Sequence, residues 1–279
     1  MTRVLALLVA VLSALPIVRT QEDKEKARKA DAAAKKAVDA CQSALTKART
    51  PEAAVDAIRD HLDGADPHPL IRTRLSQLLQ GHPFVEARIA AVDALGRYQR
   101  DKEAARVLMV NSRLQKDLEL QKKCLRRFGA AAPYGMSLEL KAWFPSESHA
   151  LAREAIEAAE AVDSIRMLQP LVELLAELEA IDEKEASGPG PNDPPIPGAS
   201  GKSTQYEKVM RKKALIDPTR KAINTLWKKH DPKTTLETHA AAAKALAANR
   251  KQLFAIQEQE DLADRGVKPS DDEGKKEGN

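Results

Sequence analysis

The side chains with the clearest potential for chemistry are basic residues clustered between residues 116 and 129. Lys122 and Arg126 stand four positions apart, as do Lys123 and Arg127. Residues at this spacing share one face of a helix, where each like-charge pair costs about a few tenths of a kcal/mol. A cluster tolerated at that cost is either a surface for an anionic partner or a solvated face. Further arginines precede it, so the candidate partner-binding residues are Arg72, Arg74, Arg88, Lys122, Lys123, Arg126 and Arg127.

The sequence predicts no catalytic, cofactor-binding or metal-binding residue. Paired carboxylates in an apolar setting, Ser/His/Asp or Cys/His arrangements and metal-ligand spacings do not rise above chance, although a site assembled from distant residues would escape this test. No pair among His61, His68 and His82 has the i, i+4 spacing that places two imidazoles on one helical face. His68 and His82 each precede a proline at an expected helix start, so we expect turn or capping histidines.

A glycine-rich segment at residues 198–204, GASGKST, imitates the end of a phosphate-binding loop. The full motif requires a glycine five places before Gly201, where Ile196 stands, and a buried strand before it, where the proline-rich segment 194–197 stands. Without that strand nothing holds the backbone N–H groups around a phosphate. We therefore expect no nucleotide binding.

The elements that would position these side chains are amphipathic helices that repeat along the chain. Within residues 85–98, apolar residues recur at i, i+4, i+7 and i+10, namely Val85, Ile89, Val92 and Leu95. The same pattern recurs downstream. A shift of 33 residues aligns Leu118, Cys124, Leu125, Phe128 and Gly129 with Val85, Ala91, Val92, Leu95 and Gly96, in that order. A shift of 67 residues aligns Ile156, Ala159 and Val162 with Ile89, Val92 and Leu95. A period in the low thirties is typical of a helical solenoid, in which each unit buries its apolar stripe against its neighbours.

Residues 89–98, IAAVDALGRY, followed by Asp101 and a second apolar segment at 107–110, resemble the first helix and turn of a HEAT-like repeat of an exported bacterial type. Residues 155–175 are similar, with Asp163 at the turn, whereas the middle unit departs by having Arg-Arg-Phe-Gly at 126–129. The resemblance covers about residues 69 to 183. It implies an all-α fold, a HEAT-like α-solenoid of antiparallel helix pairs, and a role as a binding surface more often than as an enzyme.

The N-terminus has the pattern of a secretory signal. Arg3 precedes an apolar run at residues 4–18, and a strongly charged segment begins at Gln21. The run is shorter than the ~20 apolar residues that span a bilayer. We expect export to the periplasm or beyond, with cleavage after Thr20 or after Ala14, and no stable membrane span after removal of the signal.

The remaining chain divides by composition. We expect a signal peptide at residues 1–20, a HEAT-like repeat domain at 21–184, a flexible Pro/Gly-rich loop at 185–205, C-terminal helices at 206–265 and a disordered tail at 266–279. In the C-terminal part, Asp217-Pro218 is predicted to end one helix and begin the next. A capping box at residues 234–237 is predicted to begin a further helix that continues to about Glu260.

Composition narrows the function to two classes. The net charge of +4 falls to +2 when Arg3 and Arg19 leave with the signal, since the first 20 residues contain no acidic side chain, and this balance does not favour nucleic-acid binding. Cys41 and Cys124 either pair in an oxidising compartment or remain buried thiols; the second is the simpler interpretation.

We expect an exported, non-catalytic scaffold that binds a protein or an anionic envelope component. The alternative is an enzyme or enzyme accessory with its site in the solenoid groove.

Overall fold

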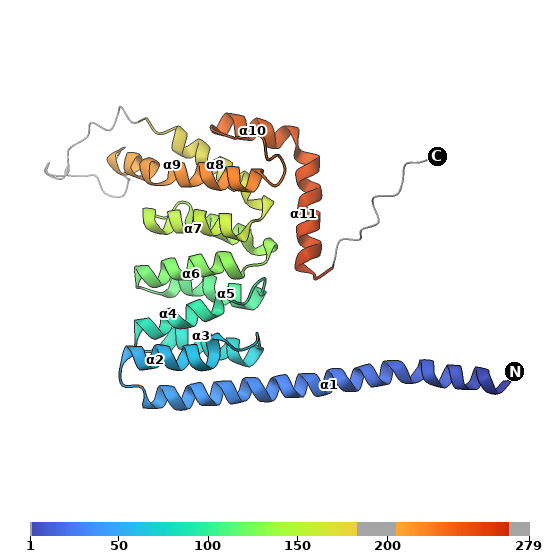
Figure 1. The fold of residues 1–279 in the computed structure, drawn as a ribbon. Coiled ribbons are helices and arrows are strands. Elements are labelled where there is room, and N and C mark those ends of the chain that lie inside the picture. The colour runs from blue at the N-terminus through green and yellow to red at the C-terminus, as the bar shows by residue number, and fades with distance from the viewer. Residues whose placement is uncertain (1, 183–204, 268–279) are drawn as a thin grey trace, which may run out of the picture. The chain divides into compact units, whose positions relative to one another are not determined.

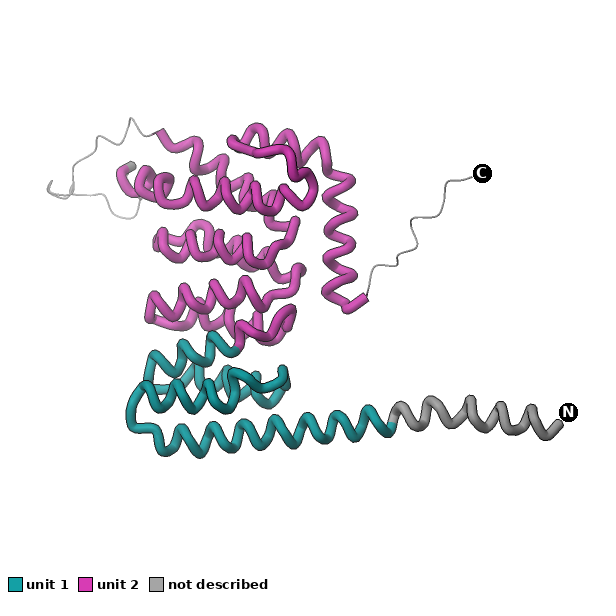
Figure 2. The backbone as a smooth tube through the Cα atoms, in the orientation of Figure 1, with its two compact units in different colours: residues 1–94 teal, residues 95–279 magenta. Residues whose placement is uncertain are grey.

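A computed structural model describes residues 2–182 and 205–267 of the chain, with side chains from residue 21 onward (Figure 1). Every regular element in these ranges is a helix, which confirms the all-α prediction. The chain forms two compact units, residues 1–94 and 95–279 (Figure 2), which are treated separately below. None of the described helices combines the length and the apolar character needed to cross a membrane. The predicted signal falls on residues whose side chains lie outside the described part.

The first unit begins with the long helix α1 (Thr2–Lys47) and continues through α2 (Pro51–Ile58), a π-helical turn η1 (Arg59–Asp63), α3 (Pro69–Gly81) and α4 (Val85–Leu95), which ends at the unit boundary. Helix α1 packs on α2, η1 and α3. Its contact face centres on Cys41, which is fully buried, while Val38 and Leu45 are half-buried. The core of this unit is aliphatic, with Ile58, Leu62, Ile71, Leu75 and Leu79 almost fully buried.

Local capping determines where these helices start. Thr50 caps α2 by accepting a hydrogen bond from the Ala53 amide (3.3 Å), and Pro51 occupies the first helical position. The predicted capping role of the histidines is confirmed. His68 Nδ1 accepts from the Leu70 amide and His82 Nδ1 from the Phe84 amide, each at 3.2 Å. Burial lowers the pKa of His82, which favours the neutral ring that this acceptor role requires.

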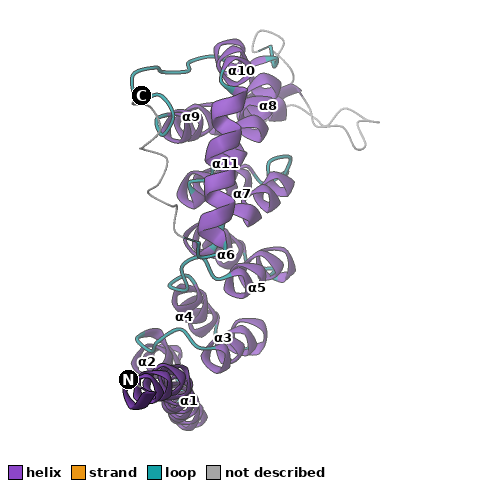
Figure 3. Ribbon diagram, turned by 90° about the vertical axis from the view of Figure 1, so that its right-hand side faces the viewer, coloured by secondary structure: helices purple, strands orange, loops and turns teal. Residues whose placement is uncertain are grey.

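The second unit contains α5 (Lys102–Leu114), α6 (Leu118–Ala131), the 3-10 helix η2 (Tyr134–Trp143), α7 (His149–Val162), the 3-10 turn η3 (Ile165–Met167), α8 (Leu168–Glu179), α9 (Gln205–Trp227), α10 (His239–Ala248) and α11 (Arg250–Asp264). Each helix packs mainly on its neighbours: α6 lies between α5 and α7, and α9 contacts α7 and α8. Helix α11 runs in a different direction, across the ends of α6 and α7 (Figures 1 and 3).

Most of the predicted apolar positions are buried, although Val85 and Ile89 at the start of α4 are only half-buried. Val92, Leu95, Leu125 and Phe128 have no exposed surface, and the same holds for Ile156 and Ala159 in α7. Leu118 is an exception, because it is the first residue of α6, beside its N-cap Asp117, and is 43% exposed. Asp101 likewise caps α5, and Asp163 ends α7 in the left-handed region (φ 59°).

Two glycines aligned by the 33-residue shift both lie close to a neighbouring segment. A Cβ atom added at Gly129 would lie 2.8 Å from the backbone oxygen of Ala158, and one added at Gly96 would lie 2.5 to 3.0 Å from Cδ, Cβ and Cγ of Arg127. Neither the backbone of a packed helix nor the Cβ atom attached to it can move aside easily. The close approach of α6 and α7 therefore depends on the glycine at position 129.

We expect Gly129→Ala to lower the free energy of unfolding by about 1 to 3 kcal/mol through overpacking between α6 and α7. Gly81→Ala at the end of α3 is the control, because nothing lies within 4 Å of a Cβ atom added there and no positive φ must be kept. Urea denaturation of the two variants measures the difference. Equal stability of both variants would show that α6 and α7 do not pack this closely.

Two predictions about the C-terminal helices are wrong. Helix α9 does not break at Asp217 but continues through Pro218. The missing proline hydrogen bond and the ring clash cost about 3 kcal/mol, while burial of side chains such as Leu215, Ile223 and Leu226 contributes about 1.5 to 3 kcal/mol each. Tertiary packing therefore outweighs the local helix-breaking signal.

The predicted capping box at 234–237 is also absent. The Leu236 amide donates to the side chain of Asn224 on α9 (2.7 Å), and the N-cap of α10 is Thr238, whose hydroxyl accepts from the Ala241 amide (3.3 Å). The single helix predicted to run to Glu260 is interrupted at Asn249, which separates α10 from α11. Apart from Gln205, Gly266 and Val267, the predicted loop at 185–205 and tail at 266–279 lie outside the described residues.

Candidate functional site

The basic residues predicted on α6 make ion pairs within the second unit. The guanidinium of Arg126 donates to both carboxylate oxygens of Glu154, each at 2.8 Å, and Glu154 is only 4% exposed. This contact raises the pKa of Arg126. Lys122 pairs with Glu119 at 2.9 Å, and Lys123 and Arg127 also interact with other groups of the protein. Part of the positive charge of this cluster is therefore neutralised by acidic neighbours that the repeat pattern did not reveal.

The remaining candidate residues belong to the first unit. Arg74 on α3 donates to Gln77 (3.3 Å) and to Gln42 of α1. Arg72 and Arg88 also interact with other groups of the protein. All three side chains are half-buried. A partner-binding role for these seven cations stays a prediction.

Two carboxylates four residues apart on α11 attach this helix to the turns of the second unit. Glu260 accepts hydrogen bonds from the Ser164 hydroxyl (2.7 Å) and from the Ile165 amide (2.8 Å). Asp264 accepts from the Tyr134 amide (3.0 Å) and the Gly135 amide (2.7 Å). Each carboxylate thus caps the start of a 3-10 helix, Glu260 at η3 and Asp264 at η2.

Cationic side chains reinforce both attachments. Arg166 pairs with Asp261 at 2.7 Å and lies 3.8 Å from Glu260. Arg100 lies 3.8 Å from Asp264 and stacks on the Tyr134 ring at 3.3 Å from its centroid. Glu260 is 5% exposed, and burial raises its pKa despite the hydrogen bonds. Because Glu260 and Asp264 lie one turn apart and bind η3 and η2, they fix the position of α11 along its own axis.

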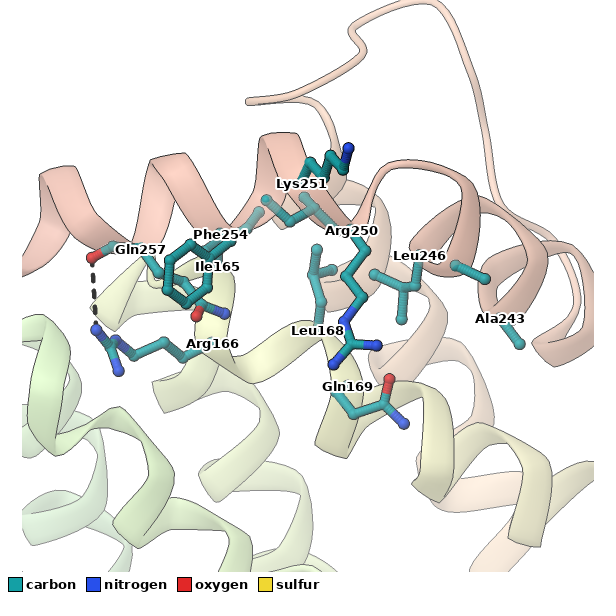
Figure 4. Close-up of a pocket in the computed structure, with 12 residues that line it drawn as sticks. Ile165, Arg166, Leu168, Gln169, Ala243, Leu246, Arg250, Lys251, Phe254 and Gln257 are labelled. Carbon is teal, nitrogen blue, oxygen red and sulfur yellow. Dashed lines mark hydrogen bonds between the residues drawn. The ribbon is translucent and has the colours of Figure 1, made fainter.

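The attachment of α11 creates an open groove of about 1020 Å³, here called the α8/α11 groove (Figure 4). Its floor is formed by η3 and α8, and its opposite wall by α10 and α11. Its lining comprises Ile165, Arg166, Leu168, Gln169, Ala243, Leu246, Ala247, Arg250, Lys251, Leu253, Phe254 and Gln257. Seven of these side chains are apolar, three are cationic, two are amides and none is a carboxylate.

Phe254 is the most unusual residue of the groove. It is 60% exposed, although the adjacent Leu253 is 8% exposed and belongs to the core. Figure 4 shows Phe254 and Arg250 projecting from α11 on one side, with Ile165 and Leu168 on the other. An aromatic side chain left in water beside apolar neighbours is typical of a binding surface.

No family model, no curated protein and no solved structure matches this chain. The likeness to HEAT-like repeats therefore stays a resemblance.

The sequence pattern identified only part of the groove. The helix predicted from residue 234 to about Glu260 contains Leu246, Leu253 and Ile256, of which Leu253 is buried and the other two are half-buried. The sequence pattern did not single out Phe254. The adjacency of Leu253 and Phe254 gave no signal of exposure, because neighbouring large apolar residues such as Leu174 and Leu175 on α8 are both buried.

The two cysteines are not arranged for chemistry. Cys41 and Cys124 are free thiols with no exposed surface. Burial raises the pKa of Cys41 to about 11 and that of Cys124 to about 12, so neither forms the reactive thiolate near neutral pH. In the part of the chain that the structure describes, no group of three or more His, Cys, Asp or Glu residues could hold a metal ion.

Proposed function

We propose that the chain is an exported HEAT-like α-solenoid that serves as a protein-interaction scaffold. The repeat architecture is supported by the equivalent buried positions of α4, α6 and α7 and by neighbour-to-neighbour packing within the second unit. In such an architecture, side chains of successive units combine into extended surfaces. Binding rather than catalysis is the function that this arrangement favours.

The observation that carries the scaffold proposal is the α8/α11 groove with its exposed Phe254. An apolar groove with an aromatic at its rim and cations beside it provides the anchor and polar edge that protein interfaces use. The repeat helices supply a rigid floor, and the carboxylates of α11 hold the opposite wall in place. The groove is therefore a formed surface before any partner arrives.

A site-specific photo-crosslinker tests the scaffold proposal. We expect p-benzoylphenylalanine in place of Phe254 to capture a defined protein in the cells that make this chain. The same crosslinker in place of the exposed Lys213 on α9 controls for incidental contacts. If positions 254 and 213 give the same crosslinks, or position 254 gives none, the groove does not bind a protein.

Export is proposed from the charged start, short apolar run and abrupt return of charge at residues 1–26. Mass spectrometry of the native protein measures this directly. We expect loss of about the first 20 residues. An intact N-terminus on protein recovered from the cytoplasmic fraction would contradict export.

A further inference from the structure

We propose that the α8/α11 groove binds an acidic, amphipathic segment of a partner protein. In this arrangement, apolar side chains of the segment contact Leu246, Ala247 and Phe254, which are the accessible apolar residues of the lining, and its carboxylates pair with Arg250 and Lys251. The inference rests on the proposed scaffold function and adds the chemistry of the partner.

The lining of the α8/α11 groove is positively charged. Three cations and no carboxylate line the groove, in a chain that has 45 basic and 41 acidic residues overall. Arg166 is already paired with Asp261. Arg250 and Lys251 are exposed and make no hydrogen bond or ion pair within residues 21–182 and 205–267. An acidic partner would supply the missing counter-charges.

Ion pairs at 2.8 to 3.1 Å elsewhere in the second unit join Arg126 to Glu154, Lys141 to Glu173, Arg153 to Glu157, Lys221 to Glu160 and Lys229 to Asp163. Within the described residues, Lys213 and Lys228 are exposed and make no ion pair, so an unpaired cation alone does not mark a site. The α8/α11 groove is distinguished by two such cations, with no carboxylate in the lining, beside an exposed aromatic side chain.

The spacing of the rim residues indicates a helical occupant. Arg250 and Phe254 are four residues apart on α11, so the cation and the aromatic lie on one face about 6 Å apart. Figure 4 shows both projecting into the groove. A partner helix with a carboxylate and an apolar side chain at i and i+4 has the same spacing and would match both groups at once.

A small ligand fits this site less well. Small-molecule sites bury about 70 to 90% of their ligand. The α8/α11 groove is open along Phe254, whose side chain is 60% exposed, so a compact ligand would remain largely hydrated. A helix lying along the groove would instead cover Phe254 and bring its own apolar surface out of water.

A membrane surface and the chain's own tail are also disfavoured as occupants. The half-buried Leu246 lies in the lining of the groove, where a helix lying along the groove can contact it more closely than a flat lipid surface can. In the sequence, the tail after Val267 carries Asp271, Asp272 and Glu273 but no large apolar residue, so it cannot fill the floor.

Fluorescence anisotropy with the full chain and labelled peptides tests the proposal. The probe is a designed helical peptide with Leu at i, i+3, i+4 and i+7 and Glu flanking each Leu. Two matched peptides replace every Glu by Lys or every Leu by Ser. We expect only the Glu/Leu peptide to bind. The protein variant Arg250→Glu/Lys251→Glu should weaken binding at least tenfold, and Phe254→Ala about tenfold.

The protein control is Lys213→Glu/Lys228→Glu, which makes the same change in net charge at exposed positions of α9 and its C-terminal end. Unchanged binding by this control, with loss in Arg250→Glu/Lys251→Glu, supports the proposal. Equal loss in both variants, binding of the Lys/Leu peptide, or failure of the Glu/Leu peptide to bind below 1 mM (about −4 kcal/mol) overturns it.

Two further arms identify the alternative occupants. Vesicles of phosphatidylglycerol and phosphatidylcholine that bind in a Phe254-dependent manner, without peptide binding, would overturn the proposal in favour of a lipid surface. Peptide binding that appears only after truncation at Val267 would overturn it in favour of the chain's own tail. If a protein crosslinks at position 254 but contacts it through a segment without acidic residues, this inference fails while the scaffold function stands.

Discussion

Phe128→Asp is expected to unfold most of the second unit at 25 °C. Phe128 lies on α6 between α5 and α7 and has no exposed surface. Loss of a buried phenylalanine costs about 3 to 5 kcal/mol, and an unpaired buried carboxylate adds several more. This total reaches the entire stability of a typical domain, about 5 to 15 kcal/mol. Circular dichroism at 222 nm with thermal melting measures the loss of helix.

The control is Leu114→Asp on the neighbouring helix α5. Leu114 is 68% exposed, so the new carboxylate stays in water and the change in unfolding free energy should remain within about 0.5 kcal/mol. Both variants introduce the same charge on adjacent helices, which separates burial from charge. Wild-type melting of Phe128→Asp would mean that α6 is placed in the wrong rotational register.

Features that depend on nearby residues were predictable from the sequence. The caps at Thr50, His68 and Asp101 each use a side chain that reaches an amide two or three residues ahead. Such contacts are encoded within a single turn, so residue type and spacing are enough to identify them. The same holds for the 3.6-residue period that predicted burial of Val92 and Phe128.

Predictions failed where distant packing overrides local preference. Pro218 is a strong helix breaker in a sequence, yet α9 continues through it because the residues on either side are buried against α7 and α8. Leu118 belongs to the predicted apolar stripe but is exposed, since a residue in the first turn of a helix lies at the edge of its packing surface. Periodicity in the sequence shows which face of a helix is apolar. It does not show which turns of that face are covered by neighbouring helices.

The α8/α11 groove could not be predicted, because the contacts that build it are remote in the sequence. Ser164 and Glu260 are separated by 96 residues, and Tyr134 and Asp264 by 130. In the sequence, acidic residues four apart on a polar helix are typical of a solvated face. Arg126 and Glu154 pose the same problem at a separation of 28 residues. Charge pairing between helices leaves no periodic signal.

Glu260→Ala is expected to release α11 from its contact at η3 while the other helices of the second unit stay folded. The substitution leaves the buried Ser164 hydroxyl and Ile165 amide without their acceptor. Each unsatisfied buried group costs about 1 to 3 kcal/mol, so docking of α11 should weaken by roughly 3 kcal/mol, a factor of about 100 or more. Hydrogen exchange measures this as faster exchange of the α11 amides. Unchanged protection of α11 would show that Glu260 does not hold it.

Glu260→Gln is the matched control and should preserve docking, because its amide oxygen still accepts from Ile165 and the Ser164 hydroxyl can rotate to accept from the amide nitrogen.

Burial raises the pKa of Glu260, and Arg166 and Lys229 are the charged groups that oppose this shift. A carboxyl whose folded pKa lies above its unfolded value of about 4.5 makes the docked state most stable at low pH, and the stability is lost as pH rises through the folded pKa. Glutamine does not titrate, so protection of α11 in Glu260→Gln should lack this pH dependence. Identical pH profiles for the wild type and Glu260→Gln would mean that Glu260 titrates as it does in the unfolded chain, and that its carboxylate is not buried beneath α11.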